Sequence, residues 1–447
     1  MNFYESYTHV TWNLPTNLLF KLQKRLFKAA YIRDKRKLIE LQKLIFQSNC
    51  ARLLAIRDVT QFCSNKTIAG IDGKVFLSFS EKFELNEYLK LNYNNWKTQS
   101  LKKVSIIKNK ETTVYLKIPT ISDRVWQTLV KFGIEPIHES LFHPSSYGFR
   151  SNITIYHVQK ALIFNLSKNS FASQKRIVFL DMSNSFCSFD HNYLVKKIIA
   201  PRSIKLGIFR LLEKGFDLEF LDETLTIPTF SSLLSNILLD GIETFQYCIR
   251  YGYFILFFLR PEDNEGYLIK NLKMFIITLG LSLNKTKFML FFAKKGFDFL
   301  GWNFKLTDKT TDGLFIFPSY VNYQSFLKRV KKIINNSNYG ALTKVFKLYP
   351  IIRDWKIYHK YSSLLKYSYS LFFVKKRAFK VFNSESRQDF YSSKRLLAKC
   401  FKASQSFDNK ILNFNFHING SYNLGHLVYL DTTLNCYFCI HCGMNLF

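Results

Sequence analysis

The sequence predicts an α+β protein with a basic helical region toward its C-terminal end. Three features support this fold class: apolar stripes with helical spacing near both ends, short β-branched and aromatic runs in the middle, and a rise in positive charge after residue 326. With 47% apolar and 21% charged residues, the composition is that of a globular protein. Its 447 residues suffice for two or three domains.

Residues 17–57 have the periodicity of two amphipathic helices. Leu18, Leu22 and Leu26 repeat at a spacing of four, and a second apolar stripe follows at 38–45. Lys and Arg fill the opposite faces. Two solvated helices explain this pattern, so periodicity alone predicts no site here.

Three apolar runs in the middle of the chain predict strands. RIVFLDMS (176–183) predicts a buried strand with Asp181 at its end, and 249–258 predicts a second, almost continuously apolar strand. GFDFLGWNF (296–304) predicts a third, and 231–246 has helical periodicity. We expect this mixed region to end near residue 305.

Charge dominates the next region. Between Phe326 and Lys402 there are 19 Lys and Arg residues but only three acids, and tyrosines and a tryptophan lie among the cations. Helical periodicity recurs at 325–335 and 351–382. A solvated bundle with an aromatic core would give the same pattern. However, so many uncompensated cations repel one another unless phosphates are near, which favours a polyanionic partner.

The whole-chain totals narrow the class of partner. A net charge of +32 suits nucleic acid or an anionic membrane surface. No apolar run is long enough to span a membrane, and MNFYESYTHVTW lacks the pattern of a signal peptide, so we expect nucleic acid and no membrane. Of the eight cysteines, five are scattered along the chain and three lie near its end, a distribution that predicts a reducing compartment. Abundant Phe and Tyr with scarce Gly and Pro are typical of an AT-rich genome, such as that of an organelle.

Several segments match one family in unbroken order. The strongest is KIPTISDRVWQTLVKFGIEPIHESLFHPSSYGFRS (117–151), which follows KTIAGIDG (66–73). RIVFLDMSNSFCSFDH (176–191), SSLLSNILLDGIE (231–243) and LYPIIRDWKIYHKYS (348–362) come next. Together these segments resemble the group II intron-encoded reverse transcriptase/maturase proteins.

This resemblance implies a right-hand polymerase-like fold, with mixed α/β fingers and palm followed by a helical thumb/maturase domain. Its parts would be an N-terminal helical extension (1–75), a degenerate reverse-transcriptase-like fingers–palm domain (76–305), a basic thumb/maturase domain (306–405) and a truncated HNH-like tail (406–447).

The chain departs from the family where the family binds metal. Asp181 matches the first palm aspartate, but Tyr253 and Phe254 replace both aspartates of the Tyr-Ala-Asp-Asp motif. Aromatic rings offer no anionic oxygen to Mg²⁺, and Asp190, nine residues past Asp181, is a poor substitute. We therefore expect no functional catalytic residue, no bound Mg²⁺ and no reverse-transcriptase activity.

Binding is then the function that the resemblance implies. We expect an intron maturase that binds a group II, or related group III, intron RNA within a precursor mRNA and assists its folding and splicing. We expect a plastid, with a mitochondrion as the alternative; a homodimer and host splicing factors are further partners that the family suggests. The candidate RNA-binding residues are Arg353, Trp355, Lys356, Tyr358, Lys360, Lys328, Arg329, Lys24, Arg25 and Lys28.

Two other classes of function stay open. One is a non-specific basic RNA- or DNA-binding protein, and the other, less favoured, is an RNA-directed DNA polymerase with a displaced metal site. In the tail, Cys436, Cys439 and Cys442 have C-x2-C-x2-C spacing, and His426 is a conceivable fourth ligand. Since no second pair follows, we expect a remnant without bound zinc.

Overall fold

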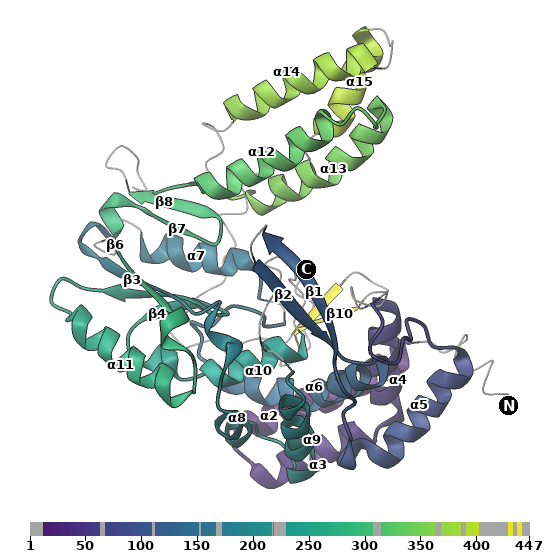
Figure 1. Ribbon diagram of the computed structural model, residues 1–447. Helices are drawn as coiled ribbons and strands as arrows, with labels where there is room; N and C mark the ends of the chain where they lie inside the picture. The colour runs from purple at the N-terminus through teal and green to yellow at the C-terminus, as the bar shows by residue number, and fades with distance from the viewer. Residues whose placement is uncertain are drawn as a thin grey trace.

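Figure 1 shows the computed structural model of the chain, a mixture of helices and small antiparallel sheets that confirms the α+β class. The structure describes residues 12–62, 68–109, 112–151, 153–166, 172–216, 218, 229–306, 314–362, 368–385, 390–401, 428–431 and 436–439. Within these ranges, no helix combines the length and the apolar character needed to cross a bilayer.

Over residues 12–57, the structure has three α-helices and not the two expected: α2 (Asn13–Tyr31), α3 (Lys35–Gln47) and α4 (Asn49–Arg57). The additional helix boundary arises because both α3 and α4 begin at an N-capping side chain. The Asp34 side chain accepts from an N–H in the first turn of α3, and Ser48 does the same for α4. An extended backbone at Ser48 separates α3 from α4, although the apolar stripe continues across it.

The next part of the chain builds the centre of the molecule. Its elements are α5 (Phe79–Asn92), the hairpin of β1 (Lys102–Asn109) and β2 (Thr112–Ile118), α6 (Ile121–Leu141) and α7 (Ile155–Asn165). Helix α6 packs on α2, α3 and α4, and most of its apolar residues are buried. This helix carries most of the segment with the strongest family resemblance.

A four-stranded antiparallel sheet follows, with strand order β4-β5-β3-β6. Its strands are β3 (Arg176–Asp181), β4 (Cys248–Tyr251), β5 (Phe254–Leu259) and β6 (Lys287–Phe292). The prediction of one strand over 249–258 was wrong, because the run folds back on itself as the β4–β5 hairpin. Gly252 has a φ of 61° and permits the two-residue turn.

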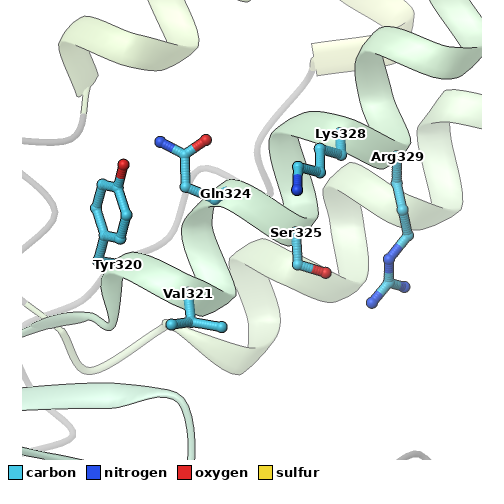
Figure 2. Close-up of a pocket in the computed structure, with 6 residues that line it drawn as sticks. All are labelled: Tyr320, Val321, Gln324, Ser325, Lys328 and Arg329. Atoms are coloured by element: carbon cyan, nitrogen blue, oxygen red, sulfur yellow. The ribbon is translucent and has the colours of Figure 1, made fainter. Parts of the chain in front are cut away.

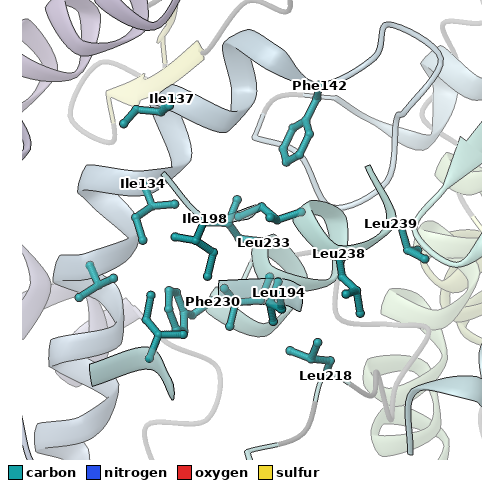
Figure 3. Packing of buried hydrophobic residues seen from close by; sticks show 14 of the residues in the cluster. Ile134, Ile137, Phe142, Leu194, Ile198, Leu218, Phe230, Leu233, Leu238 and Leu239 are labelled. Atoms are coloured by element: carbon teal, nitrogen blue, oxygen red, sulfur yellow. The ribbon is translucent and has the colours of Figure 1, made fainter. Parts of the chain in front are cut away.

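Helices cover both faces of this sheet. Helices α8 (His191–Lys197), α9 (Arg202–Glu213), α10 (Phe230–Leu239) and α11 (Glu265–Thr278) share one hydrophobic cluster with one sheet face. Figure 3 shows this cluster where α6, α8 and α10 meet. Helix α10 is shorter than expected because Gly241, with a φ of 98°, turns the chain out of it.

On the other face, α7 packs with a second sheet formed by β7 (Phe297–Phe299), β8 (Trp302–Leu306) and β9 (Leu314–Pro318). The third apolar run is therefore a hairpin and not a single strand. Leu300 and Gly301, with φ of 48° and 78°, form its turn. The expected end of the mixed region falls inside β8, which pairs with β9 along its whole length.

The basic region is a bundle of four helices: α12 (Tyr320–Ile334), α13 (Ala341–Tyr358), α14 (Ser368–Glu385) and α15 (Phe390–Phe401). The periodicity over 351–382 therefore belongs to two helices, α13 and α14. The bundle has its own hydrophobic cluster, with Phe326, Leu348 and Trp355 among its members. It extends away from the rest of the molecule in Figure 1.

Candidate functional site

The first candidate site is the β4–β5 turn, which lies beside the end of β3. Asp181 is opposite Phe254 in the register of β3 with β5. Since Tyr251 pairs with Phe254, the turn itself consists of Gly252 and Tyr253. The structure thus brings Asp181 next to Tyr253 and Phe254, which lie more than 70 residues later in the sequence.

Aromatic rings surround this turn. The Tyr253 side chain is 6% exposed, and its ring lies edge-on to that of Phe254 at 4.6 Å. Phe254 stacks on Phe179 at 6.0 Å, and Phe149 lies 6.3 Å from Tyr253. Burial also raises the pKa of the Tyr251 hydroxyl. Such surroundings penalise an anion, because it would lose its hydration without gaining a partner.

The SYGFR segment packs its backbone directly against the turn. A Cβ atom on Gly148 would lie 2.0 Å from the Gly252 nitrogen, and one on Gly252 would lie 2.3 Å from the Phe149 ring. The Tyr147 N–H donates to the Arg250 carbonyl at 2.8 Å, which holds the segment in place. Both glycines are therefore required by close approach.

A buried ion pair supports the hairpin from within the protein. Arg250 and Glu243 both have fully buried side chains, and Arg250 Nε donates to the Glu243 carboxylate at 2.6 Å. Arg250 Nη1 donates to Asn236 Oδ1 at 3.0 Å, and the Asn236 amide donates to the Gly148 carbonyl at 2.9 Å. Burial, and then the charge of Glu243, raise the pKa of Asp240. A single network thus joins α10, the SYGFR segment and β4.

Asp181 and Asp190, the two carboxylates considered as possible metal ligands, both accept backbone N–H groups. Asp181 accepts the Ser183 N–H at 2.9 Å, and Asp190 caps α8 by accepting two N–H groups of its first turn. In the part of the chain that the structure describes, no three His, Cys, Asp or Glu side chains are placed to hold a metal ion. The donor set at the turn does not fit the two Mg²⁺ ions of the family's polymerases.

The second candidate site is the helical bundle, where two predicted aromatic contacts have structural roles. Trp355 is 7% exposed and stacks on Phe326 at 4.5 Å inside the bundle. Tyr358 stacks on Trp302 at 4.9 Å and donates its hydroxyl to the Leu300 carbonyl. Burial takes the Trp355 ring out of reach of an RNA base, which argues against the prediction that Trp355 binds RNA. Tyr358 thus joins the bundle to the β7–β8 hairpin, while Trp355 belongs to the core of the bundle.

Three predicted cations of α13 and the residues after it already have partners in the protein. Lys356 donates to a main-chain carbonyl at the end of α15 at 2.8 Å, and burial lowers its pKa. Arg353 pairs with its neighbour Asp354 at 2.9 Å, and Lys360 lies 5.4 Å from the Tyr361 ring. The Arg353 pair is more than half exposed, so it contributes little and leaves Arg353 accessible.

Lys328 and Arg329 lie differently, on the outer face of α12. This face is a shallow, open surface groove whose lining residues all belong to α12. Its lining residues, all drawn in Figure 2, are Tyr320, Val321, Gln324, Ser325, Lys328 and Arg329. Among the described residues, none provides a hydrogen-bond, ion-pair or ring partner for Tyr320, Gln324, Lys328 or Arg329.

Sequence reasoning missed two members of this groove, Tyr320 and Gln324. The signal was present in their spacing. They precede Lys328 by eight and four residues, which places all three on one helix face. Trp355 and its neighbours match family positions, but a match in sequence does not show which face of a helix a residue occupies.

The N-terminal candidates form a separate cationic stripe on α2. Arg25 and Lys28 are exposed, Lys24 is half-buried, and α2 contains no acidic residue. The opposite face, with Leu26 and Gln23, is buried against the rest of the protein. These cations are therefore available to an external anion.

In the tail, Cys436 and Cys439 are the first and last residues of β11 (Cys436–Cys439), which pairs with β10 (Val428–Asp431). Cys442 and His426 lie outside the described residues. The expectation of a remnant without zinc stays a prediction.

Comparisons with known proteins identify the family of this chain. A family model for the N-terminal domain of reverse transcriptase matches residues 7–89. "Maturase-like protein 1" of Euglena gracilis is 55% identical over 444 residues, which cover 98% of this chain and 97% of the relative. Its namesake from Euglena longa is 52% identical over the same shares. "Protein YkfC" of Escherichia coli (strain K12) is 28% identical over 149 residues, 29% of this chain and 36% of the relative. The chain belongs to the reverse transcriptase/maturase family.

Proposed function

We propose that this protein is an intron maturase without polymerase activity: it binds a group II, or related group III, intron RNA within a precursor mRNA and assists its folding and splicing. One observation carries the proposal. At the β4–β5 turn, Tyr253 and Phe254 belong to an aromatic cluster at the positions where the family has metal-binding aspartates. Full-length relatives named maturase-like proteins support the splicing role.

The proposed architecture is a right hand. The β4-β5-β3-β6 sheet is its palm, and α12 to α15 form its thumb/maturase domain. We propose four parts: an extension at 1–75, fingers and palm from 76, a thumb/maturase domain, and a tail at 406–447. Because β8 pairs with β9, we now place the end of the palm after Pro318 instead of at 305.

The proposed RNA contacts are the cations that the protein leaves available. These are Lys328 and Arg329 on α12 and Lys24, Arg25 and Lys28 on α2. Cations without a protein partner bind phosphates and release counterions, which gives affinity that depends on salt. Arg353 and Lys360 are secondary candidates, while Lys356, Trp355 and Tyr358 act by fixing the shape of the bundle.

A second candidate function is non-specific binding of RNA or DNA. The cationic stripe on α2 favours it, since contacts to phosphates carry no sequence information. An RNA-directed DNA polymerase with a displaced metal site is a weaker alternative, because it needs carboxylates that the turn does not supply. For the compartment we propose a plastid, with a mitochondrion as the alternative; a homodimer and host splicing factors are further expectations.

The test is binding of the purified full-length chain to its own candidate intron and to a length-matched control RNA across a salt series. We expect tighter binding to the intron, and a difference that persists at high salt, because recognition of a folded RNA is not purely electrostatic. Coincident curves that fall together with salt would leave only the non-specific function. Mg²⁺-dependent primer extension that disappears in Asp181→Ala would instead support the displaced metal site.

A further inference from the structure

We infer that the outer face of α12 binds a single-stranded segment of RNA, with one unpaired base stacked on Tyr320 and adjacent phosphates on Lys328 and Arg329. This inference rests on the proposed function and deepens it, because it names the form of nucleic acid that this groove accepts.

The groove has two parallel rows of side chains. Each row has a spacing of four residues, and the rows are Tyr320, Gln324 and Lys328, and Val321, Ser325 and Arg329. Residues four apart rise about 6 Å along a helix, so Tyr320 and Lys328 are separated by about 12 Å. That span is close to the length of a dinucleotide.

The chemistry of the lining fits an unpaired nucleotide. Tyr320 is 73% exposed at the start of α12, and its ring has no ring partner among the described residues. An exposed ring offers a face on which any base can stack. The Gln324 amide, one helical turn away, has donors and an acceptor for a base edge or a 2′-hydroxyl.

The positive charge of α12 favours an anionic ligand, and the other groups on this face indicate which one. Helix α12 carries Lys328, Arg329, Lys331 and Lys332 and has no acidic residue. A double helix would satisfy the cations but would keep its bases stacked inside, away from Tyr320. An acidic peptide would likewise leave the ring without a planar partner. Only a single strand uses the ring, the amide and the cations together.

The experiment measures fluorescence anisotropy with the full-length chain and three probes: a labelled single-stranded RNA without self-complementarity, the same RNA as a duplex, and inorganic polyphosphate as competitor. We expect Tyr320→Ala to weaken single-strand binding about tenfold, and Tyr320→Phe to bind as the wild type does. Polyphosphate and duplex affinities should stay unchanged in both variants. Lys328→Gln and Arg329→Gln should each reduce the salt slope for the single strand by about 0.7.

Matched controls are available on α11. Tyr267 is 69% exposed, and Lys270 lies on the same helix, so Tyr267→Ala and Lys270→Gln repeat the two chemical changes elsewhere. Both should bind as the wild type does. Tyr320→Leu keeps an apolar side chain without a ring and should behave like Tyr320→Ala, which separates stacking from any change in stability.

Two results would overturn the inference: wild-type single-strand affinity in Tyr320→Ala, or an equal loss for the single strand and for polyphosphate. Either can occur while the wild type still prefers its intron, so the proposed function would survive. Conversely, if the wild type binds intron and control RNA equally well, the maturase proposal is refuted. The inference that a base stacks on Tyr320 would still stand.

Discussion

Replacing Glu243 by glutamine should strongly destabilise the protein, because it leaves the charge of Arg250 buried without a counter-charge. Both side chains are completely buried, and the pair joins β4 to the turn that follows α10. Removing one partner of such a pair costs about 3–5 kcal/mol. Since domains are stable by about 5–15 kcal/mol, Glu243→Gln removes a large share of the free energy of unfolding.

The assay is urea denaturation followed by circular dichroism, with Glu265→Gln as the control. Glu265 pairs with Arg176 at 3.2 Å, but its side chain is 40% exposed. Loss of this exposed pair should cost at most about 1 kcal/mol. The two variants delete the same charge, so their difference measures the effect of burial.

A Glu243→Gln variant as stable as Glu265→Gln would refute the reasoning. The double variant Glu243→Leu with Arg250→Met provides a further check. Apolar residues of similar volume often replace a buried ion pair at little cost, so the double variant should be more stable than Glu243→Gln alone. If it is less stable, the hydrogen bonds of Arg250 to the Asn236 side chain and the Gly252 carbonyl carry the stability, and not the ion pair.

Three other predictions follow from the same structure. Restoring the family's motif with Tyr253→Asp and Phe254→Asp should not give Mg²⁺-dependent primer extension, and it should destabilise the fold by at least about 3 kcal/mol, because Tyr253 is buried; extension above the wild-type level would contradict this. Replacing Lys24, Arg25 and Lys28 on α2 by glutamine should lower the salt slope of RNA binding by about 2–3, and an unchanged slope would remove α2 from the interface. Burial lowers the pKa of His138 to about 3, and its Nε2 accepts the Ile199 N–H. The unfolded chain therefore binds a proton that the folded chain does not, and stability should fall as the pH drops below about 6.5, by at most about 1.4 kcal/mol per unit for this group. His138→Gln, which keeps an acceptor, should show a shallower pH dependence in thermal melts, and an identical dependence would count against this assignment.

The apolar pattern located the β3 strand, and the family resemblance located Asp181, Tyr253 and Phe254, but neither predicted the hairpin that brings these residues together. An apolar run of ten residues satisfies the pattern of one buried strand equally well. The discriminating residue was Gly252, since a glycine inside a strand-like run is typical of a turn or a close backbone approach. Both occur here, because Gly252 forms the turn and packs against the SYGFR segment.

The candidate RNA contacts were harder to predict, because burial depends on tertiary packing and not on residue type. Trp355 and Lys328 both lie in a basic, aromatic region, yet Trp355 is in the bundle core and Lys328 is on its surface. Arg250, the one cation within an apolar run, did predict a feature of the packing. Arg250 required a buried partner on physical grounds, but the sequence offered no means to identify Glu243.

The proposed loss of the metal site and the proposed binding of RNA are electrostatically compatible. In a polymerase, divalent ions offset the charge of the palm carboxylates. Without those ions, clustered carboxylates would repel one another and any RNA phosphate within about a Debye length, roughly 8 Å at physiological salt. Aromatic residues at positions 253 and 254 remove two of these anions and extend the hydrophobic cluster beneath the sheet. Under the proposed function, the same two replacements remove ligands that a polymerase would need, and they also remove two negative charges from the field of a chain with a net charge of +32.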